Sequence, residues 1–199
     1  IQPAMQYTTA AEAVKLIQSG QSVYIQGSTS IPEVLVAAMA DRGAELRGVK
    51  LYSAFAVGAH EAPYCRPEYR ESFLVNSLFV ANNIRRWLAD GYGQSIPAFL
   101  GEIPGLFRDG TIPLDVALIN VSPPDAEGYC SFGVSADLAV SAVECARTVI
   151  AQVNHAMPFS YGDAVIHSSR FAAAVEVDSP LVEVPTAVPT ETELRIGRA

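Results

Sequence analysis

Short hydrophobic runs alternate with amphipathic stretches along most of the chain. The runs predict β-strands at 22–26, 49–55, 72–80, 96–100, 114–121 and 148–153. The amphipathic stretches predict helices at 9–17, 32–41, 82–91, 102–110 and 136–147. From residue 164 onward the pattern predicts strands without a long helix between them, at 164–169, 172–177 and 181–186.

Strands that alternate with helices are typical of a parallel sheet covered on both faces. The run at 114–121 is apolar throughout, which indicates a strand buried on both faces. We therefore expect a three-layer α/β/α fold with a mostly parallel sheet. Thr190 and Glu193 form a capping box that predicts a helix over residues 190–199. Because a helix that begins so close to the last residue adds little stability, we expect that the chain is cut from a longer protein; a frayed natural terminus is the less favoured alternative.

Composition and charge narrow the class of protein. Half of the 199 residues are hydrophobic and 17% are charged, which fits a substantial buried core. The formal net charge of −8 argues against a general nucleic-acid surface, because phosphate binding needs a basic stripe. No apolar stretch is long enough to span a membrane and no signal peptide is recognisable. We expect a soluble, cytoplasmic protein that contacts neither nucleic acid nor a membrane.

Cysteine and histidine offer no metal-binding pattern. The three cysteines are widely spaced and match no zinc motif, which favours a reducing compartment. His60, His155 and His167 lack paired metal-ligand spacing. We predict no metal site and no tightly bound cofactor.

The segment "QGSTSIP" (26–32) follows a predicted strand and precedes a predicted helix. A turn of this kind places unpaired N–H groups and a helix dipole where a carboxylate or phosphate binds well. It lacks the spacing of a P-loop or of a dinucleotide-binding fingerprint. Local evidence favours the simpler alternative, an ordinary helix N-cap supplied by Thr29 or Ser30.

The segment "INVSPPDAEGYCSFGVSADL" (119–138) follows the most apolar strand. Ligands of open α/β sheets bind beyond the carboxyl ends of the strands, so this loop is well placed for a site. The alternative is a rigid connection in which Ser135 caps the next helix, and residue types alone leave the two readings even. Cys130 could act as a nucleophile, but a buried, unreactive thiol is the better interpretation.

Several segments in the same order resemble one enzyme family. They are "GSTSIPEVLVAAM", "VNSLFVANNIRR", "GEIPGLFRDG", "DVALINVSPPDAEGYCSFGVSAD" and "VIAQVNHAMP". Together they resemble the N-terminal half of the acetyl-CoA hydrolase/transferase family, which includes 4-hydroxybutyrate and succinyl-CoA:acetate CoA-transferases. The resemblance implies an N-terminal CoA-transferase-type domain over residues 1–189, with residues 190–199 leading to a C-terminal catalytic domain absent from this chain.

The resemblance also implies a mechanism. In the family, a glutamate of the C-terminal half attacks an acyl-CoA thioester, and a glutamyl-CoA intermediate passes the CoA to a small carboxylic acid. CoA is then a substrate, and the chain's partners are acyl-CoA, small carboxylates, its own C-terminal domain and, in a homodimer, a second copy. No catalytic residue is assigned here, because the family's His-Ser/Thr-Glu segment is absent and His60-Glu61 lacks its context. The fragment alone is expected to be inactive.

The family motifs assign a substrate-binding role to three segments, which also pack the domains. The assigned residues are Gly27, Ser28, Thr29 and Ser30 in the first turn; Ser122, Pro123, Pro124, Gly128, Ser131 and Gly133 in the proline-containing loop; and Asn154, Met157 and Pro158 after the last buried strand.

The sequence departs from the family at two places, "FSY" (159–161) and "HEAPY" (60–64). These departures leave the specificity for the acyl acceptor undetermined. Two other functions are considered. One is a stand-alone, non-catalytic binding or regulatory module with the same fold, and the other is an unrelated α/β enzyme such as a sugar-phosphate isomerase.

Overall fold

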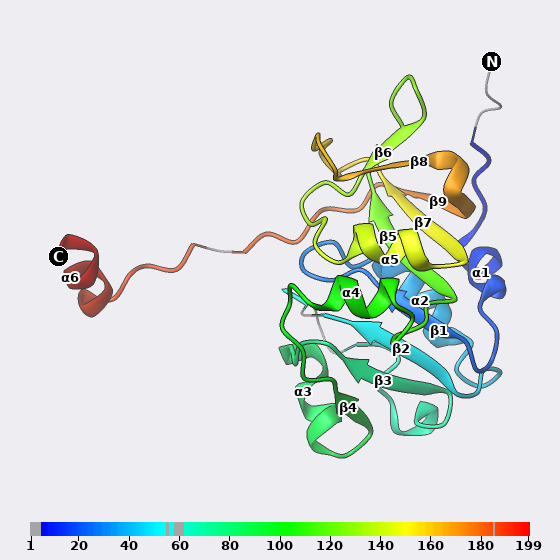
Figure 1. The fold of residues 1–199 in the computed structure, drawn as a ribbon, viewed down its shortest axis with the longest axis horizontal. Helices are drawn as coiled ribbons and strands as arrows, with labels where there is room; N and C mark the ends of the chain where they lie inside the picture. The colour runs from blue at the N-terminus through cyan, green and yellow to red at the C-terminus, as the bar shows by residue number, and fades with distance from the viewer. Residues whose placement is uncertain (1–4, 55, 58–61, 185) are drawn as a thin grey trace.

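A seven-stranded parallel sheet forms the centre of the molecule (Figure 1). The computed structural model describes residues 5–54, 56–57, 62–184 and 186–199. The central strands are β1 (Ser22–Ile25), β2 (Val49–Ser53), β3 (Phe73–Ser77), β4 (Gly93–Ser95), β5 (Val116–Val121), β7 (Thr148–Asn154) and β9 (Phe171–Val177). A separate antiparallel pair consists of β6 (Tyr129–Ser131) and β8 (Val165–His167).

Helices cover both faces of the sheet. They are α1 (Ala10–Ala13), which continues into the 3-10 turn η1 (Val14–Leu16), α2 (Glu33–Asp41), α3 (Asn82–Ala89), α4 (Ile103–Arg108) and α5 (Ala139–Cys145). A further helix, α6 (Glu191–Arg198), lies near the end of the chain and covers neither face. Two short 3-10 turns are η2 (Pro67–Tyr69) and η3 (Ser168–Arg170). The expected three-layer α/β/α fold with a parallel sheet is confirmed.

The strand order places a switch point at the middle of the sheet. The order is β4-β3-β2-β1-β5-β7-β9, and all neighbours are parallel. β2, β3 and β4 therefore follow one another on one side of β1. The chain then crosses to the other side of β1, where β5, β7 and β9 follow one another. The connections that leave the carboxyl ends of β1 and β5 diverge to opposite faces, which opens a crevice suited to ligands.

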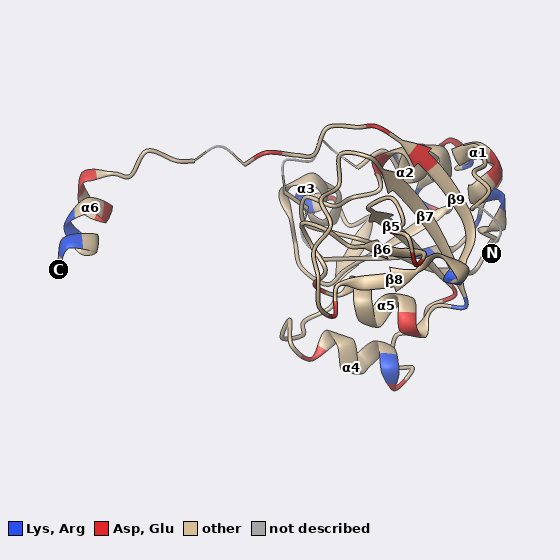
Figure 2. Ribbon diagram, turned by 90° about the horizontal axis from the view of Figure 1, so that it is seen from above, with Lys and Arg blue, Asp and Glu red and all other residues tan. Residues whose placement is uncertain are grey.

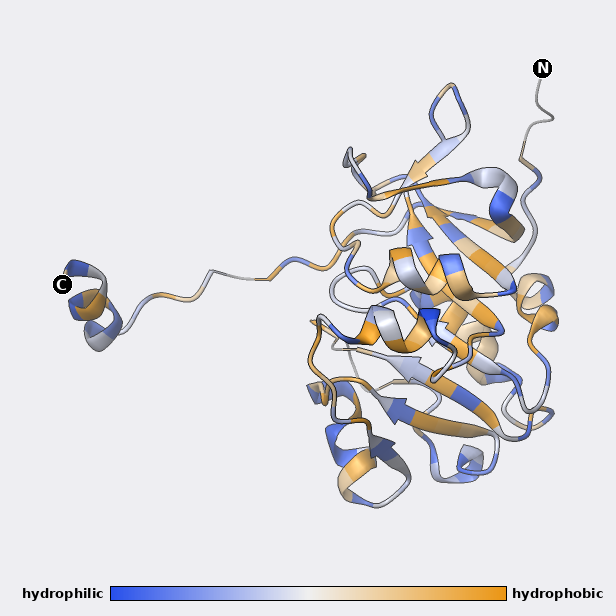
Figure 3. Ribbon diagram, viewed as in Figure 1, coloured by the Kyte–Doolittle hydropathy of each residue, from blue (hydrophilic) through white to orange (hydrophobic). Residues whose placement is uncertain are grey.

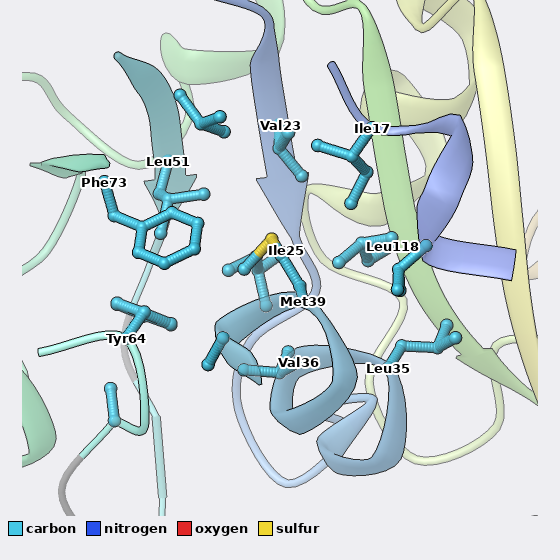
Figure 4. Close-up of a cluster of buried hydrophobic side chains, with 14 of the residues drawn as sticks. Ile17, Val23, Ile25, Leu35, Val36, Met39, Leu51, Tyr64, Phe73 and Leu118 are labelled. Atoms are coloured by element: carbon cyan, nitrogen blue, oxygen red, sulfur yellow. The ribbon is translucent and has the colours of Figure 1, made fainter. Parts of the chain in front are cut away.

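Each face of the sheet has its own hydrophobic core. On one face, α1, α2 and α3 pack over apolar side chains of β1, β2, β3 and β5, and Figure 4 shows Leu35, Val36 and Met39 of α2 pointing at Val23, Ile25 and Leu118. On the other face, α4 and α5 cover a second cluster that includes Phe107, Ile119 and Ala142. Figure 3 shows the apolar strands enclosed by helices whose outer faces are more polar. As expected for β5, all of its residues are buried.

Three element predictions were wrong. The strand predicted at 96–100 is β4, Gly93–Ser95, and the apolar residues after it include Phe99, whose side chain is 80% exposed. The residues 181–184 form no strand. Ser135 does not cap α5, because that helix begins at Ala139, and the Ser135 hydroxyl donates instead to Asp137. The two apolar runs were present but did not pair as strands. The capping residue was present, but the helix begins four residues later.

The C-terminal helix was predicted correctly. Thr190 and Glu193 form both hydrogen bonds of the capping box, and α6 spans Glu191–Arg198. Figure 2 shows its acidic residues at the first turn and its basic residues at the last, the arrangement that complements the helix dipole. Residues after β9 extend away from the sheet, so that α6 lies apart from the body of the domain (Figure 1).

Candidate functional site

The turn that follows β1 is tied to the loops around β5 by one buried glutamine. Gln26 is fully buried, and its Oε1 accepts a hydrogen bond from the Asn120 N–H at 2.7 Å. Its Nε2 donates to the Ser135 carbonyl oxygen at 2.7 Å. One side chain therefore fixes three segments at the switch point relative to one another.

The residues after Gln26 form a tight and strained turn. Ser28 has a φ of 58°, a left-handed conformation that costs a non-glycine residue energy and is concentrated at functional sites. The Ser28 carbonyl accepts from the Val57 N–H, and the Ser30 N–H donates to Gly27. The turn is thereby held by bonds both within itself and to the segment after β2.

The N-terminus of α2 is not capped by the side chain of its own N-cap residue. Its N-cap residue is Pro32, so the prediction that Thr29 or Ser30 is an ordinary N-cap was wrong. The Val34 N–H donates instead to Oε1 of Gln152, on β7, at 3.0 Å. The Ser30 hydroxyl is buried and has no hydrogen-bond partner among the described residues. The hydroxyl residues of the turn are therefore not used to start the helix.

A small cavity, here called the polar pocket, lies between this turn and the carboxyl ends of β5 and β7. It has a volume of about 50 Å³, and its polar lining residues are Ser28, Thr29, Glu33, Asn120, Gln152, Asn154 and Ser179. Among the residues that the structure describes, Glu33 is the only charged one in its lining. The pocket contains part of the first predicted segment and one residue of the third.

Three amide side chains continue the sheet face that α2 covers. Asn120 and Gln152 are register partners on β5 and β7, and Asn154 follows Gln152 by two residues on the same face. Leu118 and Ile150 occupy this face one step earlier, within the apolar core. The face therefore changes from apolar to polar at the carboxyl edge, where the switch point lies.

Asn154 holds the segment that leaves β9. Its Nδ2 donates to the Ser179 carbonyl oxygen at 2.9 Å, and its Oδ1 accepts from the N–H groups of Ser179 and Ala156, both at 3.1 Å. Both ends of the amide are therefore hydrogen-bonded to backbone groups. In this structure Asn154 shapes the wall of the polar pocket, since Ser179 forms part of that wall.

A second cavity, here called the apolar pocket, lies on the other side of the 27–31 turn. It has a volume of about 220 Å³ and a mainly apolar lining that includes Val36, Ala54, Ala62 and Tyr64. Ile31 and Glu33 line both pockets. The two cavities together offer an aliphatic compartment beside a small polar one.

The loop after β5 is rigid because its own hydrogen bonds close it. The Ser122 hydroxyl accepts from the Ser131 N–H at 2.8 Å, and the Asp125 carboxylate accepts from the N–H groups of Glu127 and Tyr129, both at 2.9 Å. Gly128 has a φ of 89°, which the turn requires. The loop contains β6, a strand that the sequence pattern did not predict.

The end of this loop packs against the segment after β7. The buried Ser131 hydroxyl donates to the Ser160 carbonyl oxygen at 2.9 Å and accepts from the N–H groups of Ser160 and Gly133. A side chain at Gly133 would collide with Met157 and meet the Pro158 carbonyl oxygen at 3.0 Å. The structure thus brings the second and third predicted segments together.

Cys130 is not placed to act as a nucleophile. It is buried on β6, and burial, with a smaller contribution from the Asp125 carboxylate, raises the pKa of its thiol to about 12. A thiol with so high a pKa is protonated at neutral pH and therefore weakly nucleophilic. This agrees with the interpretation of Cys130 as an unreactive core residue.

The predicted site residues form two groups rather than one. Ser28, Thr29 and Asn154 line the polar pocket and Gly27 lines the apolar pocket, whereas the residues of the 122–133 loop line neither. His60 and Glu61 lie outside the described residues. The sequence analysis did not single out Gln26, Asn120 or Gln152, although polar residues at the ends of apolar strands were a usable signal.

The part of the chain that the structure describes contains neither a cluster of metal ligands nor a membrane-spanning helix. No group of three or more potential metal ligands comes together there. Within the same residues, no helix has the length and apolar character needed to cross a bilayer.

Comparison with known proteins gives a consistent result. Residues 4–189 match the family described as the acetyl-CoA hydrolase/transferase N-terminal domain. The chain is 37% identical over 189 residues to 4-hydroxybutyrate coenzyme A transferase of Clostridium kluyveri, covering 95% of this chain and 44% of that protein. It is 34% identical to a succinyl-CoA:acetate/propanoyl-CoA:succinate CoA transferase of Fasciola hepatica, covering 94% of this chain and 39% of that protein.

Solved structures agree with these relatives. RipA from Yersinia pestis superposes with a TM-score of 0.82 at 30% identity, over 94% of this chain and 45% of that one. A 4-hydroxybutyrate CoA-transferase from Porphyromonas gingivalis gives a TM-score of 0.72 at 33% identity, over 90% of this chain and 41% of that one. The chain spans less than half the length of each of these proteins.

Proposed function

Because the chain belongs to the acetyl-CoA hydrolase/transferase family through its N-terminal domain, we propose that the intact protein transfers CoA between an acyl-CoA thioester and a small carboxylic acid. The relatives named above are CoA-transferases, which supports this assignment. The observation that carries it is the pair of pockets at the switch point, because a small acyl group needs an aliphatic compartment with a polar end.

The proposed chemistry is covalent transfer through a glutamate that lies outside this chain. The glutamate carboxylate attacks the thioester carbonyl and expels the CoA thiolate, leaving an acyl-glutamyl anhydride. The thiolate then attacks the glutamyl carbonyl, releases the acid and forms a glutamyl-CoA thioester. The incoming carboxylate reverses both steps and leaves as the new acyl-CoA.

In this proposal, the N-terminal domain supplies the acyl side of the cleft. The apolar pocket excludes water from the acyl chain, and the strained turn at Ser28 and Thr29 forms the boundary between the two pockets. The loop from Ser122 to Gly133 acts as a rigid wall toward a C-terminal domain. A cytoplasmic location and a homodimer are proposed with this function and do not affect its chemistry.

Borohydride distinguishes the covalent route from direct transfer. The intact protein, first incubated with acetyl-CoA, is expected to lose CoA transfer on borohydride treatment, because the glutamyl thioester is reduced to an alcohol that cannot react again. Protein treated without acetyl-CoA is the control and should remain active. Equal activity in both samples would contradict the covalent mechanism, whereas acyl-CoA binding without any turnover would favour a non-catalytic binding module.

A further inference from the structure

The face of the sheet that α4 and α5 cover is open over β2, β3 and β4. Those two helices pack over β1, β5 and β7, where almost every strand residue is buried. On β2 and β3 the pattern alternates instead. Lys50 is exposed between two buried apolar residues, and Leu74, 43% exposed, lies between the buried Phe73 and Val75. Because parallel strands covered on both faces are usually apolar on both, this alternation indicates a face that stays accessible.

A broad hollow, here called the open groove, lies over this half of the sheet. It has a volume of about 750 Å³, and its lining includes Lys50 of β2, Leu74 of β3 and Gln94 of β4. Arg70 and Glu71, which precede β3, also line it. These residues lie at the amino-terminal ends of their strands, and none of them lines the polar or the apolar pocket at the carboxyl edge.

Two unpaired cations line the open groove. Neither the Lys50 nor the Arg70 side chain makes an ion pair, a hydrogen bond or a ring contact with the described residues, and before residue 190 only Arg85 shares this state among them. The chain carries a net charge of −8, whereas the groove has these two cations against one carboxylate, Glu71. Cations left unpaired in a hollow of an acidic protein favour an anionic ligand.

The floor of the open groove places an apolar side chain between charge and amide. Lys50 and Leu74 are register partners on β2 and β3, and Asn76 follows Leu74 by two residues on the same face. Asn76 is the register partner of Gln94, whose Nε2 donates to the Asn76 Oδ1 at 2.5 Å. The groove therefore combines cations, an acceptor carboxylate, an amide and one exposed aliphatic surface.

We propose that the open groove binds a nucleotide, with its phosphates on Lys50 and Arg70. Ammonium and guanidinium groups both donate strong hydrogen bonds to phosphate. Glu71 accepts from the ribose hydroxyls, as acidic residues do in dinucleotide-binding folds, and the base lies on Leu74 with its polar edge toward Gln94. The volume suits a ligand larger than inorganic phosphate. This inference does not depend on the proposed CoA transfer.

Calorimetric titration of the intact protein with ADP tests the proposal. Lys50→Met and Arg70→Met each remove one cation and keep an aliphatic side chain. We expect each variant to raise the Kd for ADP by about tenfold, the effect of losing one charge-assisted hydrogen bond. Both side chains are exposed, so the melting temperature should not change. Added salt should weaken ADP binding to the wild type, because the contacts are exposed to solvent.

Arg85→Met is the matched control. Arg85 is an exposed, unpaired arginine on α3 that lies outside the lining of the open groove, so this variant should leave the Kd for ADP unchanged. Ribose 5-phosphate and inorganic phosphate serve as smaller probes. Both should bind more weakly than ADP, since neither has a base to contact Leu74.

Each result decides for or against the proposal. A Kd that rises in both groove variants but not in Arg85→Met supports it. Absence of ADP binding overturns it, and so does an equal Kd in all variants, which would locate ADP elsewhere, for example where acyl-CoA binds. Ribose 5-phosphate that binds as tightly as ADP contradicts the assignment to a nucleotide. CoA transfer is measured separately on the same protein, so that failure of either proposal leaves the other standing.

Discussion

At the scale of single residues, the site depends on positions whose backbone or side-chain conformation is restricted by their surroundings. Ser28 adopts a left-handed conformation beside the polar pocket, and Gln26 uses both ends of its amide to hold the loops around it. Gly133 is constrained in a different way, by a φ of 63° and by Met157 directly against it. Small changes at such positions should therefore have large effects.

Gly133→Ala is expected to destabilise the domain by roughly 1–3 kcal/mol. The added methyl group would collide with the Met157 side chain and crowd the Pro158 carbonyl, and alanine disfavours positive φ. Urea unfolding measures the loss. Gly101→Ala is the matched control, because nothing lies within 4 Å of its added carbon. Equal stability of the two variants would show that the Gly133 contact is not needed.

At the scale of elements, one side chain fixes the exit of the chain from the sheet. The Asn154 amide makes three hydrogen bonds to backbone groups, two of them to Ser179, just beyond β9. The segment after it leads to α6 and forms one wall of the polar pocket. Asn154 therefore couples the shape of the pocket to the direction of the C-terminal segment.

Asn154→Ala should loosen this segment without unfolding the sheet. With both bonds to Ser179 lost, hydrogen exchange of the Ser179 amide is expected to become about tenfold faster or more, as each bond contributes on the order of 1 kcal/mol. Asn154→Asp keeps the acceptor and should give a smaller increase. Exchange in β5 is the internal control and should not change. Unaltered exchange at residue 179 would mean that the amide does not hold the segment.

Most of the elements, but not the detailed site, could be predicted from sequence. The apolar run at 114–121 and the capping box at Thr190 depend on local periodicity and local bonds, and both were confirmed. The run at 96–100 failed because strand pairing is decided by distant residues, here β3, which pairs with 93–95 instead. Asn120 was missed for the same reason, since it meets Thr29 and Gln152, which are distant in sequence, only in the lining of the polar pocket.

At the scale of the whole molecule, large apolar residues are exposed to solvent near the carboxyl edge of the sheet. Phe99 and Tyr161, 80% and 87% exposed, belong to segments that follow the carboxyl ends of β4 and β7. Exposed aromatic residues at one edge are typical of a surface that contacts another domain or protein. This supports the proposal that a C-terminal domain closes the site, consistent with relatives of more than twice this length.

The central claim, that the intact protein transfers CoA to a carboxylic acid, is tested most directly by isotope exchange. Acetyl-CoA is mixed with ¹³C-labelled acetate and the protein, with no other acid present. A CoA-transferase with a covalent enzyme–CoA intermediate predicts that label enters acetyl-CoA at a rate proportional to protein concentration, while the total amount of acetyl-CoA stays constant. Loss of acetyl-CoA without label in the remainder, or no reaction at all, would contradict the account.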